Sequence, residues 1–167
     1  TGVQTCALPI FLKVKLLVLF GLLLFSVVSI ASVEGDRLLA FWFTEDDNAT
    51  VEIYREDDAY FGRIVSLKNP LYADDTTTGM AGQPKVDLNN PDLDKQSRPI
   101  VGLSLLRGFI YIGDNKWRKG KIYDPGNGKD YDCNIKLKDD GSLSLRCYIG
   151  FSLFGRTTIW RPTTKPS

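Results

Sequence analysis

The stretch Asp87–Asp94, with the sequence DLNNPDLD, is the part of the chain richest in side chains that could ligate a metal ion. Asp and Asn oxygens are the hard ligands that Ca²⁺ prefers. However, Pro91 stands where a calcium loop would place a ligand, and no glycine supplies the sharp turn. The same side chains also cap turns and short helices without any metal. We therefore expect a structural role and no metal; Asp87, Asn90 and Asp92 are the ligands that calcium would use if this expectation is wrong.

Histidine is absent from all 167 positions of the chain. Its absence excludes Ser-His-Asp and Cys-His nucleophilic pairs, His-ligated zinc and the usual proton shuttle at neutral pH. Paired carboxylates could serve glycoside hydrolysis, but nearly all acidic residues fall in predicted turns, where they favour turn formation and solubility. We therefore expect a protein that is not an enzyme and uses no cofactor.

Basic and acidic side chains are balanced, with 21 Lys and Arg against 20 Asp and Glu. Leaving out Lys13 and Lys15, which belong to an N-terminal leader, reduces the 21 basic residues to 19. Nucleic-acid-binding domains usually carry a strong basic excess, so we expect no nucleic-acid partner. The basic cluster KWRKGK at Lys116–Lys121 could contact phosphate or an anionic membrane, but we interpret it as the solvated end of a hairpin.

The leader resembles a secretory signal peptide. Lys13 and Lys15 precede the apolar run Leu16–Ile30, and the small residues Ser29 and Ala31 suit a signal peptidase that cuts after Ala31. The alternative is a membrane anchor, because the run approaches the length that spans a bilayer. We expect cleavage and a periplasmic or secreted protein, with membrane contact only through an uncleaved signal. The first ten residues, TGVQTCALPI, resemble translated sequencing-adapter read-through, so we assign residues 1–31 to read-through plus signal peptide.

Alternating apolar residues predict an all-β domain over residues 36–162, followed by a disordered tail at residues 163–167. No segment has a sustained helical period, and turn residues separate the predicted strands. Eight short strands adjacent in sequence suggest an up-and-down barrel or a sandwich, and a barrel leaves no exposed edge. The predicted strands are Leu38–Phe43, Thr50–Arg55, Tyr60–Leu67, Leu103–Ile112, Lys116–Tyr123, Tyr131–Lys138, Ser142–Ile149 and Arg156–Arg161.

One hairpin can be placed in register from its sequence. Ile135 and Leu137 must share a face with Leu143 and Leu145, because a slip of one residue would expose one of the two sets. Leu137 then pairs with Leu143, and Ile135 pairs with Leu145. The loop becomes Asp139–Gly141, a three-residue connection with glycine at its left-handed position.

The same register places Cys133 opposite Cys147. Directly opposed residues lie close enough for a disulfide, and an exported protein meets an oxidising compartment. We predict a Cys133–Cys147 bond; the alternative is two buried free thiols.

Aromatic residues in the predicted strands are the best indication of a binding site. An eight-stranded barrel is just wide enough to be filled by side chains or to hold one small ligand, and apolar pockets with a few polar groups hold such ligands. A filled core without a cavity is the alternative. Arg146 lies on the face opposite Leu145 and is the least suitable polar anchor. The candidate ligand-binding residues are Trp42, Tyr54, Tyr111, Trp117, Tyr123, Tyr131, Arg156 and Trp160.

Several motifs resemble the domain-of-unknown-function 2147 family of exported bacterial proteins. The matching segments are VEIY at Val51–Tyr54, FGRIVSL at Phe61–Leu67, NPD at Asn90–Asp92, RPIVGLSLLRGF at Arg98–Phe109, Trp117, GKIYDPGNGKDYDC at Gly120–Cys133 and RCYIGFSLFGRTTIW at Arg146–Trp160. Ala40 and Cys147 stand where the family favours glycine.

The resemblance implies a small lipocalin-like barrel without an assigned activity. In such barrels a first-strand Trp often packs against an Arg of the last strand, which suggests Trp42 with Arg156 or Arg161. By analogy of fold alone, the resemblance implies a barrel that carries a small hydrophobic ligand or lipid. The alternative function is a structural or interaction module of the cell envelope with a filled barrel.

Overall fold

The computed structural model describes residues 34–45, 48–74, 79–150, 153 and 155–166. The chain divides into two units, residues 1–34 and 35–167, and the architecture below is that of the second unit. The expected read-through residues and signal peptide, residues 1–31, lie outside the described residues. Across the described ranges, no helix has both the length and the apolar character needed to cross a bilayer.

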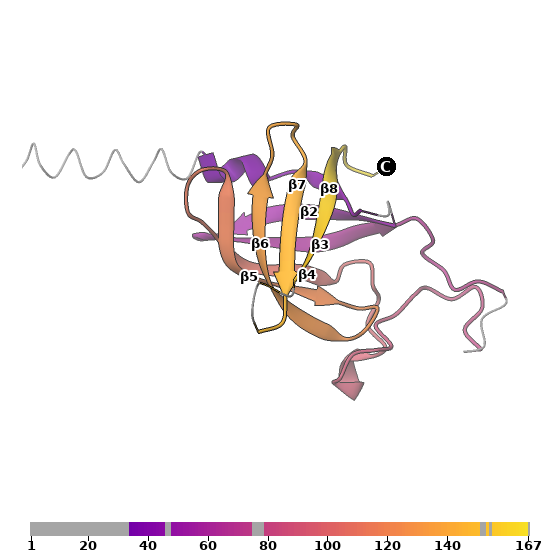
Figure 1. Ribbon diagram of the computed structural model, residues 1–167. Helices are drawn as coiled ribbons and strands as arrows, with labels where there is room; N and C mark the ends of the chain where they lie inside the picture. Colours follow the sequence, from indigo (N-terminus) through magenta and orange to yellow (C-terminus); the bar gives the residue numbers. More distant parts are fainter. Residues whose placement is uncertain (1–33, 46–47, 75–78, 151–152, 154, 167) are drawn as a thin grey trace, which may run out of the picture. The chain divides into compact units, whose positions relative to one another are not determined.

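Eight antiparallel strands close into a barrel in which each strand pairs with the next in sequence and β8 pairs with β1 (Figure 1). The strands are β1 (Phe41–Phe43), β2 (Ala49–Glu56), β3 (Ala59–Leu67), β4 (Ser104–Tyr111), β5 (Lys116–Asp124), β6 (Lys129–Leu137), β7 (Leu143–Tyr148) and β8 (Arg156–Thr163). Two short 3-10 helices accompany them, η1 (Asp36–Leu38) and η2 (Leu93–Lys95). The up-and-down order confirms the predicted barrel and rules out the sandwich.

The β6–β7 hairpin has the register predicted from its sequence. Leu137 pairs with Leu143, and Ile135 pairs with Leu145. All four side chains are buried, because strand side chains alternate between the two faces and the apolar set must share one. Gly141 closes the three-residue loop with a φ of +79°, the left-handed conformation in which glycine carries no steric penalty.

One end of the barrel, the closed end, is covered by η1. Leu38 is completely buried there, and Trp42 Nε1 donates a hydrogen bond of 3.1 Å to its carbonyl oxygen. Tyr60 Oη donates to the Asp36 carboxylate at 2.9 Å, and Arg55 pairs with the same carboxylate at 3.1 Å. These contacts tie η1 to the barrel wall and fill its interior at this end.

The first strand is shorter than predicted. The expected strand Leu38–Phe43 is reduced to Phe41–Phe43, because residues 36–38 turn into η1 and place Leu38 inside the barrel instead of in its wall. The last strand is longer, since β8 continues through Thr163, beyond the expected end at Arg161 and into the expected tail. Pro162 faces Trp42 in this extension.

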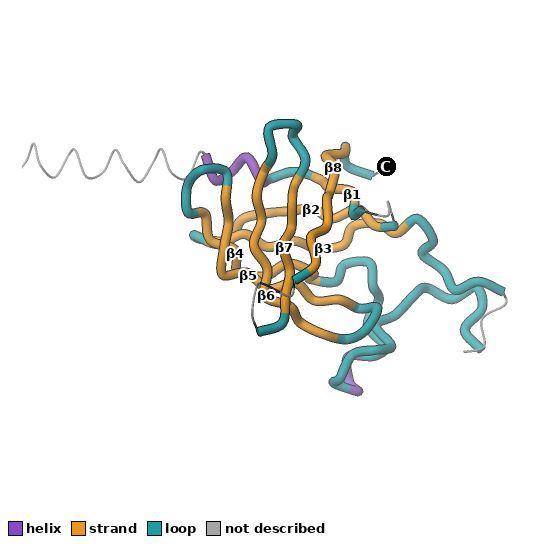
Figure 2. Tube along the Cα trace, viewed as in Figure 1, coloured by secondary structure: helices purple, strands orange, loops and turns teal. Residues whose placement is uncertain are grey.

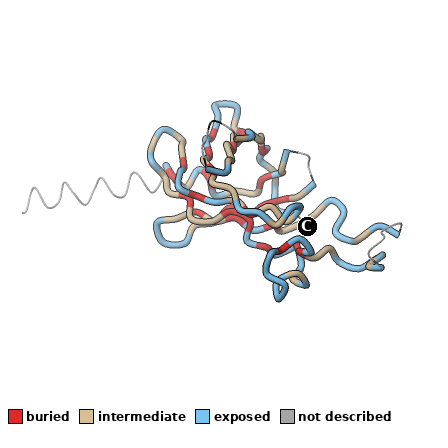
Figure 3. Tube along the Cα trace, turned by 60° about the horizontal axis from the view of Figure 1, so that its bottom comes forward, coloured by how far each residue is buried: buried red, intermediate tan, exposed pale blue. Residues whose placement is uncertain are grey.

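A long connection between β3 and β4, residues 68–103, leaves the sheet at the opposite end of the barrel. It is the extended loop that runs away from the strands in Figure 2. Two isolated bridges, Leu71 with Pro84 and Val86 with Pro99, hold it together. Proline lacks a backbone N–H, so these positions cannot continue a ladder. Buried positions follow the strands, whereas most of this connection is exposed (Figure 3).

Candidate functional site

The end of the barrel opposite η1, the open end, contains a cavity of about 720 Å³, here called the mouth cavity. In an up-and-down barrel every second connection lies at the same end, and the β1–β2, β3–β4, β5–β6 and β7–β8 connections lie here. The cavity is lined by Thr44, Glu45, Leu105, Ile122, Tyr123, Asp124, Pro125, Asn127, Tyr131, Cys147, Tyr148, Ile149, Arg156, Thr158 and Trp160.

Charged and polar groups of the mouth cavity bind one another at its rim. Arg156 pairs with Glu45 at 3.1 Å across the junction of β8 and the β1–β2 turn. The Asp124 carboxylate accepts hydrogen bonds of 2.8 Å from Gly126 N and from Asn127 Nδ2. Asn127 Nδ2 also donates to Tyr131 Oη at 2.9 Å. The rim is therefore polar, whereas Leu105, Ile122 and Trp160 contribute apolar surface to the wall.

A disulfide joins the β6 and β7 walls of the cavity. Cys133 and Cys147 are directly paired across the hairpin, their Cα atoms are 4.2 Å apart, and their sulfurs are bonded. Cys133 is buried, and Cys147 lines the cavity opposite Arg156. The bond thus covalently fixes the spacing of two strands at the open end.

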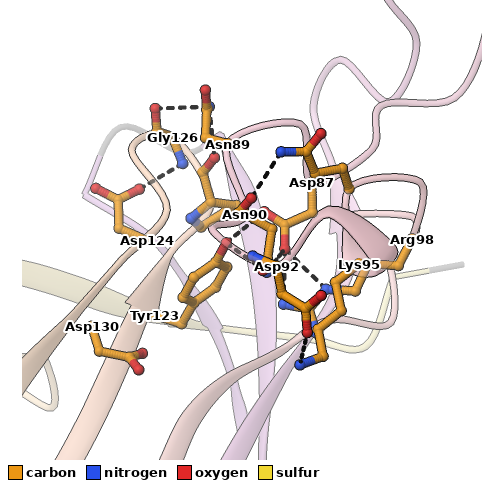
Figure 4. A network of polar contacts seen from close by, with 12 residues as sticks. Asp87, Asn89, Asn90, Asp92, Lys95, Arg98, Tyr123, Asp124, Gly126 and Asp130 are labelled. Atoms are coloured by element: carbon orange, nitrogen blue, oxygen red, sulfur yellow. Dashed lines mark hydrogen bonds and ion pairs between the residues drawn. The ribbon is translucent and has the colours of Figure 1, made fainter.

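Below the rim, Asp87 is a completely buried carboxylate with three partners (Figure 4). Tyr123 Oη donates to Asp87 Oδ1 at 2.7 Å, and Asn90 Nδ2 donates to Oδ2 at 2.8 Å. Arg98 supplies two charge-assisted contacts to Oδ2, at 2.9 Å from Nε and 2.8 Å from its terminal nitrogen. Its guanidinium carbon also lies 5.5 Å from the centre of the Tyr123 ring. Burial, followed by the hydrogen bond to Asp87, raises the pKa of Tyr123.

The side-chain oxygens of Asp87, Asn90 and Asp92, named above as possible calcium ligands, are engaged in contacts within the protein. Asp87 is neutralised by Arg98, and Asn90 Oδ1 accepts from the backbone of Asp92 at 2.9 Å. Asp92 caps η2 by accepting from Asp94 N at 3.2 Å and pairs with Lys95 at 2.7 Å. The Lys95 hydrogen bond is the largest of the effects that lower the pKa of Asp92. In these contacts the stretch has a capping and charge-pairing role.

The Asp87–Pro99 segment is attached to the β5–β6 turn. Asn89 Nδ2 donates hydrogen bonds of 3.0 Å to the carbonyl oxygens of Pro125 and Gly126. Gly128 approaches so closely that a Cβ at this position would lie 1.8 Å from the Asn89 carbonyl oxygen. A second hollow of about 420 Å³, here called the side hollow, lies beside this contact. Its lining residues are Asn48, Leu67, Asn69, Tyr72, Lys85, Val86, Ile100, Pro125 and Gly126.

Four of the eight candidate ligand-binding residues line the mouth cavity: Tyr123, Tyr131, Arg156 and Trp160. Trp42, Tyr111 and Trp117 do not line it. Trp117 is buried against Tyr111, with ring centres 5.2 Å apart, and Trp42 is hydrogen-bonded to Leu38 of η1. These three aromatic residues lie in strands as predicted, but they pack at the closed end of the barrel, away from the mouth cavity.

Tyr54, a predicted ligand-binding residue, lies on the outer surface of the barrel. Its neighbour Ile53 is buried, and successive side chains of a strand point to opposite faces. Outside, the Tyr54 ring stacks on Phe61 with centres 6.1 Å apart, and Arg63 lies 5.6 Å from the Tyr54 ring centre. Tyr54 is therefore excluded from the set that could contact a ligand inside the barrel.

The expected packing of Trp42 against an arginine of β8 is also wrong. Trp42 points inward, whereas Arg161 is exposed and pairs with the outward-facing Phe43. Arg156 does share the inner face of β8 with Trp160, but it lies at the open end and pairs with Glu45. The partner of the Trp42 indole is instead the carbonyl oxygen of Leu38.

Sequence reasoning missed the lining residues that lie in turns or beside them. Thr44, Glu45, Asn127 and Ile149 belong to the β1–β2, β5–β6 and β7–β8 connections, whereas the sequence-based prediction rests on aromatic residues in strands. The predicted topology could have identified these turn residues. Once an up-and-down barrel is assumed, alternate connections must gather at one end and form one rim.

Comparisons with known proteins agree with this architecture. Residues 41–161 match a family described as uncharacterized protein conserved in bacteria (DUF2147). The fold is similar to that of protein HP1028 from the human pathogen Helicobacter pylori, which is described as belonging to the lipocalin family. The TM-score is 0.64 at 20% sequence identity, over 77% of this chain and 84% of that one. No curated protein sequence matches this chain.

Proposed function

The chain belongs to the bacterial family DUF2147, and we propose that it is an exported, non-enzymatic barrel that binds one small apolar or amphipathic molecule, such as a lipid. The observation that carries this proposal is the mouth cavity. Its volume of about 720 Å³ falls within the range of about 300–1,000 Å³ that is usual for small-molecule sites. Apolar walls with a polar rim suit a ligand that has an apolar body and a polar end.

The chemistry of the rim supports binding over catalysis. Glu45 and Asp124 are the carboxylates of the cavity, and both are occupied, the first by Arg156 and the second by the amides of its own turn. A general acid or base would need a carboxylate directed at a substrate in the cavity instead of at a protein partner. The chain also contains no histidine that could take that role.

The alternative is an envelope interaction module with a filled barrel. The closed end is packed in the way that such a module requires, with Leu38, Trp42 and Trp117 buried together in one core cluster. The mouth cavity at the other end favours ligand binding, because a solid barrel would have no need of it. The two functions differ in whether a small molecule enters the open end.

A fluorescent probe tests the proposal directly. N-phenyl-1-naphthylamine is apolar and becomes brighter out of water, so it should bind the mouth cavity with a rise in emission. Trp160 lines the cavity and should transfer excitation energy to the bound probe. Dodecanol, an unbranched amphiphile, should then displace the probe. An absence of probe binding and of any co-purified small molecule in native mass spectrometry would overturn the proposal.

Two neighbouring threonines provide a matched pair of variants. Thr158 lines the mouth cavity, and Thr157 lies on the exposed outer face of the same strand. Thr158→Phe should place a ring in the space of the ligand and raise the probe Kd roughly tenfold or more. Thr157→Phe adds the same ring outside and should leave the Kd unchanged. Equal Kd values for both variants would place the probe elsewhere on the protein.

Export is part of the same proposal and has its own test. Cleavage after Ala31 would make Ser32 the first residue of the mature protein. The intact mass of protein recovered from the periplasm or the medium should correspond to a chain that begins at Ser32. A mass that includes the apolar run would instead indicate a retained anchor.

A further inference from the structure

Two cations line the hollows at the open end, and they differ in their partners. Arg156 lines the mouth cavity and is neutralised by Glu45 at 3.1 Å. Lys85 lines the side hollow, where its side chain is half-buried. Within the described part of the chain, the Lys85 ammonium has neither an ion pair nor a hydrogen bond. A partly desolvated ammonium without a counter-ion favours an anion taken up from solution.

Two side-chain amides accompany Lys85. Asn48 and Asn69 also line the side hollow, and among the described residues neither side-chain amide makes a hydrogen bond. Each amide offers two N–H donors to an anionic oxygen. Leu67, Val86 and Ile100 contribute the apolar remainder of the wall. The hollow therefore combines one positive charge and several free donors with an apolar surface.

The backbone around Lys85 is fixed before any ligand arrives. Lys85 N donates to Pro70 O at 2.8 Å, and Lys85 O accepts from Ile100 N at 3.0 Å. The bridges of Leu71 with Pro84 and of Val86 with Pro99 flank it on both sides. Its Cα is thus held at the side hollow, and only the side chain has to be ordered when an anion binds. Such preorganisation reduces the entropic cost of binding.

The side hollow and the mouth cavity are neighbours at the β5–β6 turn, where Pro125 lines both. We propose that Lys85, with Asn48 and Asn69, binds the anionic headgroup of an amphiphile whose apolar chain lies in the mouth cavity. This inference rests on the proposed function and specifies the ligand class as a carboxylate or phosphate carried on an apolar chain. Lys85 acts as the specificity-determining residue, and Arg156 stays paired with Glu45.

Three ligands with the same alkyl chain separate the headgroup from the chain. Dodecanoate, dodecyl phosphate and dodecanol are each used to displace N-phenyl-1-naphthylamine from the full mature protein. Dodecanoate, dodecyl phosphate or both should bind about tenfold more tightly than dodecanol. A hydrogen bond to a charged group contributes enough free energy to change the Kd by this factor. Comparison of the two anions identifies whether the site prefers carboxylate or phosphate.

Variants of Lys85 locate the effect. Lys85→Met should remove the preference for the anions and leave dodecanol binding unchanged, whereas Lys85→Arg should retain the preference. Lys136→Met is the control, because Lys136 carries the same charge on the exposed outer face of β6 and lines neither hollow. It should bind all three ligands as the unaltered protein does.

The outcomes distinguish this inference from the proposed function. If dodecanol and both anions bind the unaltered protein equally, the headgroup site is wrong and the ligand-binding barrel stands. The same conclusion follows if Lys85→Met keeps the anion preference. If none of the three ligands displaces the probe, both are overturned.

Discussion

At the scale of single residues, two buried tryptophans differ in whether their indole N–H is satisfied. Trp42 is 2% exposed and donates to the Leu38 carbonyl oxygen, whereas Trp117 is completely buried and its Nε1 has no partner among the described residues. A buried donor without a partner costs free energy that a buried hydrogen bond avoids. Trp117 is held in place by ring contacts, at 5.2 Å from Tyr111 and 6.2 Å from Tyr60.

The two tryptophans give a prediction about stability. Both Trp42→Phe and Trp117→Phe lose part of a buried ring, but only the first also leaves a buried carbonyl unpaired. We expect Trp42→Phe to lower the free energy of unfolding by about 1–2 kcal/mol more than Trp117→Phe. Urea unfolding of the two variants side by side measures the difference. A larger loss in Trp117→Phe would mean that its indole N–H has a partner after all.

Tyr60 gives a prediction about alkaline pH. Burial and then the hydrogen bond to Asp36 raise the pKa of Tyr60 from 10.0 to about 12. Folding therefore favours the neutral phenol, and this stabilisation is present below about pH 10 and is lost as the pH rises toward 12. Tyr60→Phe has no phenol to ionise, so its free energy of unfolding should fall less steeply over this interval. Unfolding curves at several alkaline pH values check this, and parallel pH profiles would contradict it.

At the scale of elements, the Asp87–Pro99 segment and the β5–β6 turn behave as one unit. Asn89 bonds two carbonyls of the turn, and Asp87 bonds Tyr123 at the end of β5. Glycine is required at the contact, because Gly128 has a φ of +71° and lies against the Asn89 carbonyl. Pro125 of this turn lines both hollows, so a shift of the unit would change both.

A matched pair of glycine substitutions tests this unit. Gly128→Ala and Gly141→Ala both force alanine into a left-handed conformation, at φ of +71° and +79°, which costs about 1 kcal/mol. Only at Gly128 would the new methyl meet another segment, since nothing lies within 4 Å of a Cβ at Gly141. We expect Gly128→Ala to be the more destabilising and to speed amide hydrogen exchange within residues 87–99. Equal exchange in both variants would show that the segment is held by other contacts.

The elements also show what the sequence could predict. All eight strands were found, because each has a period-two pattern bounded by turn residues, and the β6–β7 register followed from one shared apolar face. The η1 plug was missed, because Leu38 is one apolar residue whose side chain enters the barrel end instead of its wall. The group proposed to bind a headgroup could not be predicted, because Asn48 comes from the β1–β2 connection and Asn69 and Lys85 from the β3–β4 connection, and only the closed barrel brings them together.

At the scale of the whole domain, the two ends of the barrel differ in packing. The closed end is filled by a continuous core that includes Leu38, Trp42, Phe109, Trp117 and Leu143. The open end keeps the mouth cavity, and the Cys133–Cys147 bond joins its β6 and β7 walls. A cavity forgoes packing energy, so ligand binding should add stability that the unliganded barrel lacks.

This difference gives a prediction for the folded domain. A ligand that binds only the native state at a concentration 100 times its Kd raises the free energy of unfolding by about 2.7 kcal/mol. Dodecanoate should therefore shift the urea unfolding curve of the unaltered protein and of Thr157→Phe. At the same dodecanoate concentration, a tenfold higher Kd in Thr158→Phe should reduce this gain to about 1.4 kcal/mol. A shift of the same size in Thr158→Phe would show that dodecanoate stabilises the fold from another site.

The junction between β1 and β8 has a mechanical consequence. β1 contributes only three residues to it, and Pro162, which faces Trp42, has no N–H to donate. β1 also pairs with β2 over three positions, but none of the β2 partners is a proline, so the β1–β8 junction alone of the two lacks a backbone donor at one of its paired positions. Under a pulling force we therefore expect the barrel to open first between β1 and β8.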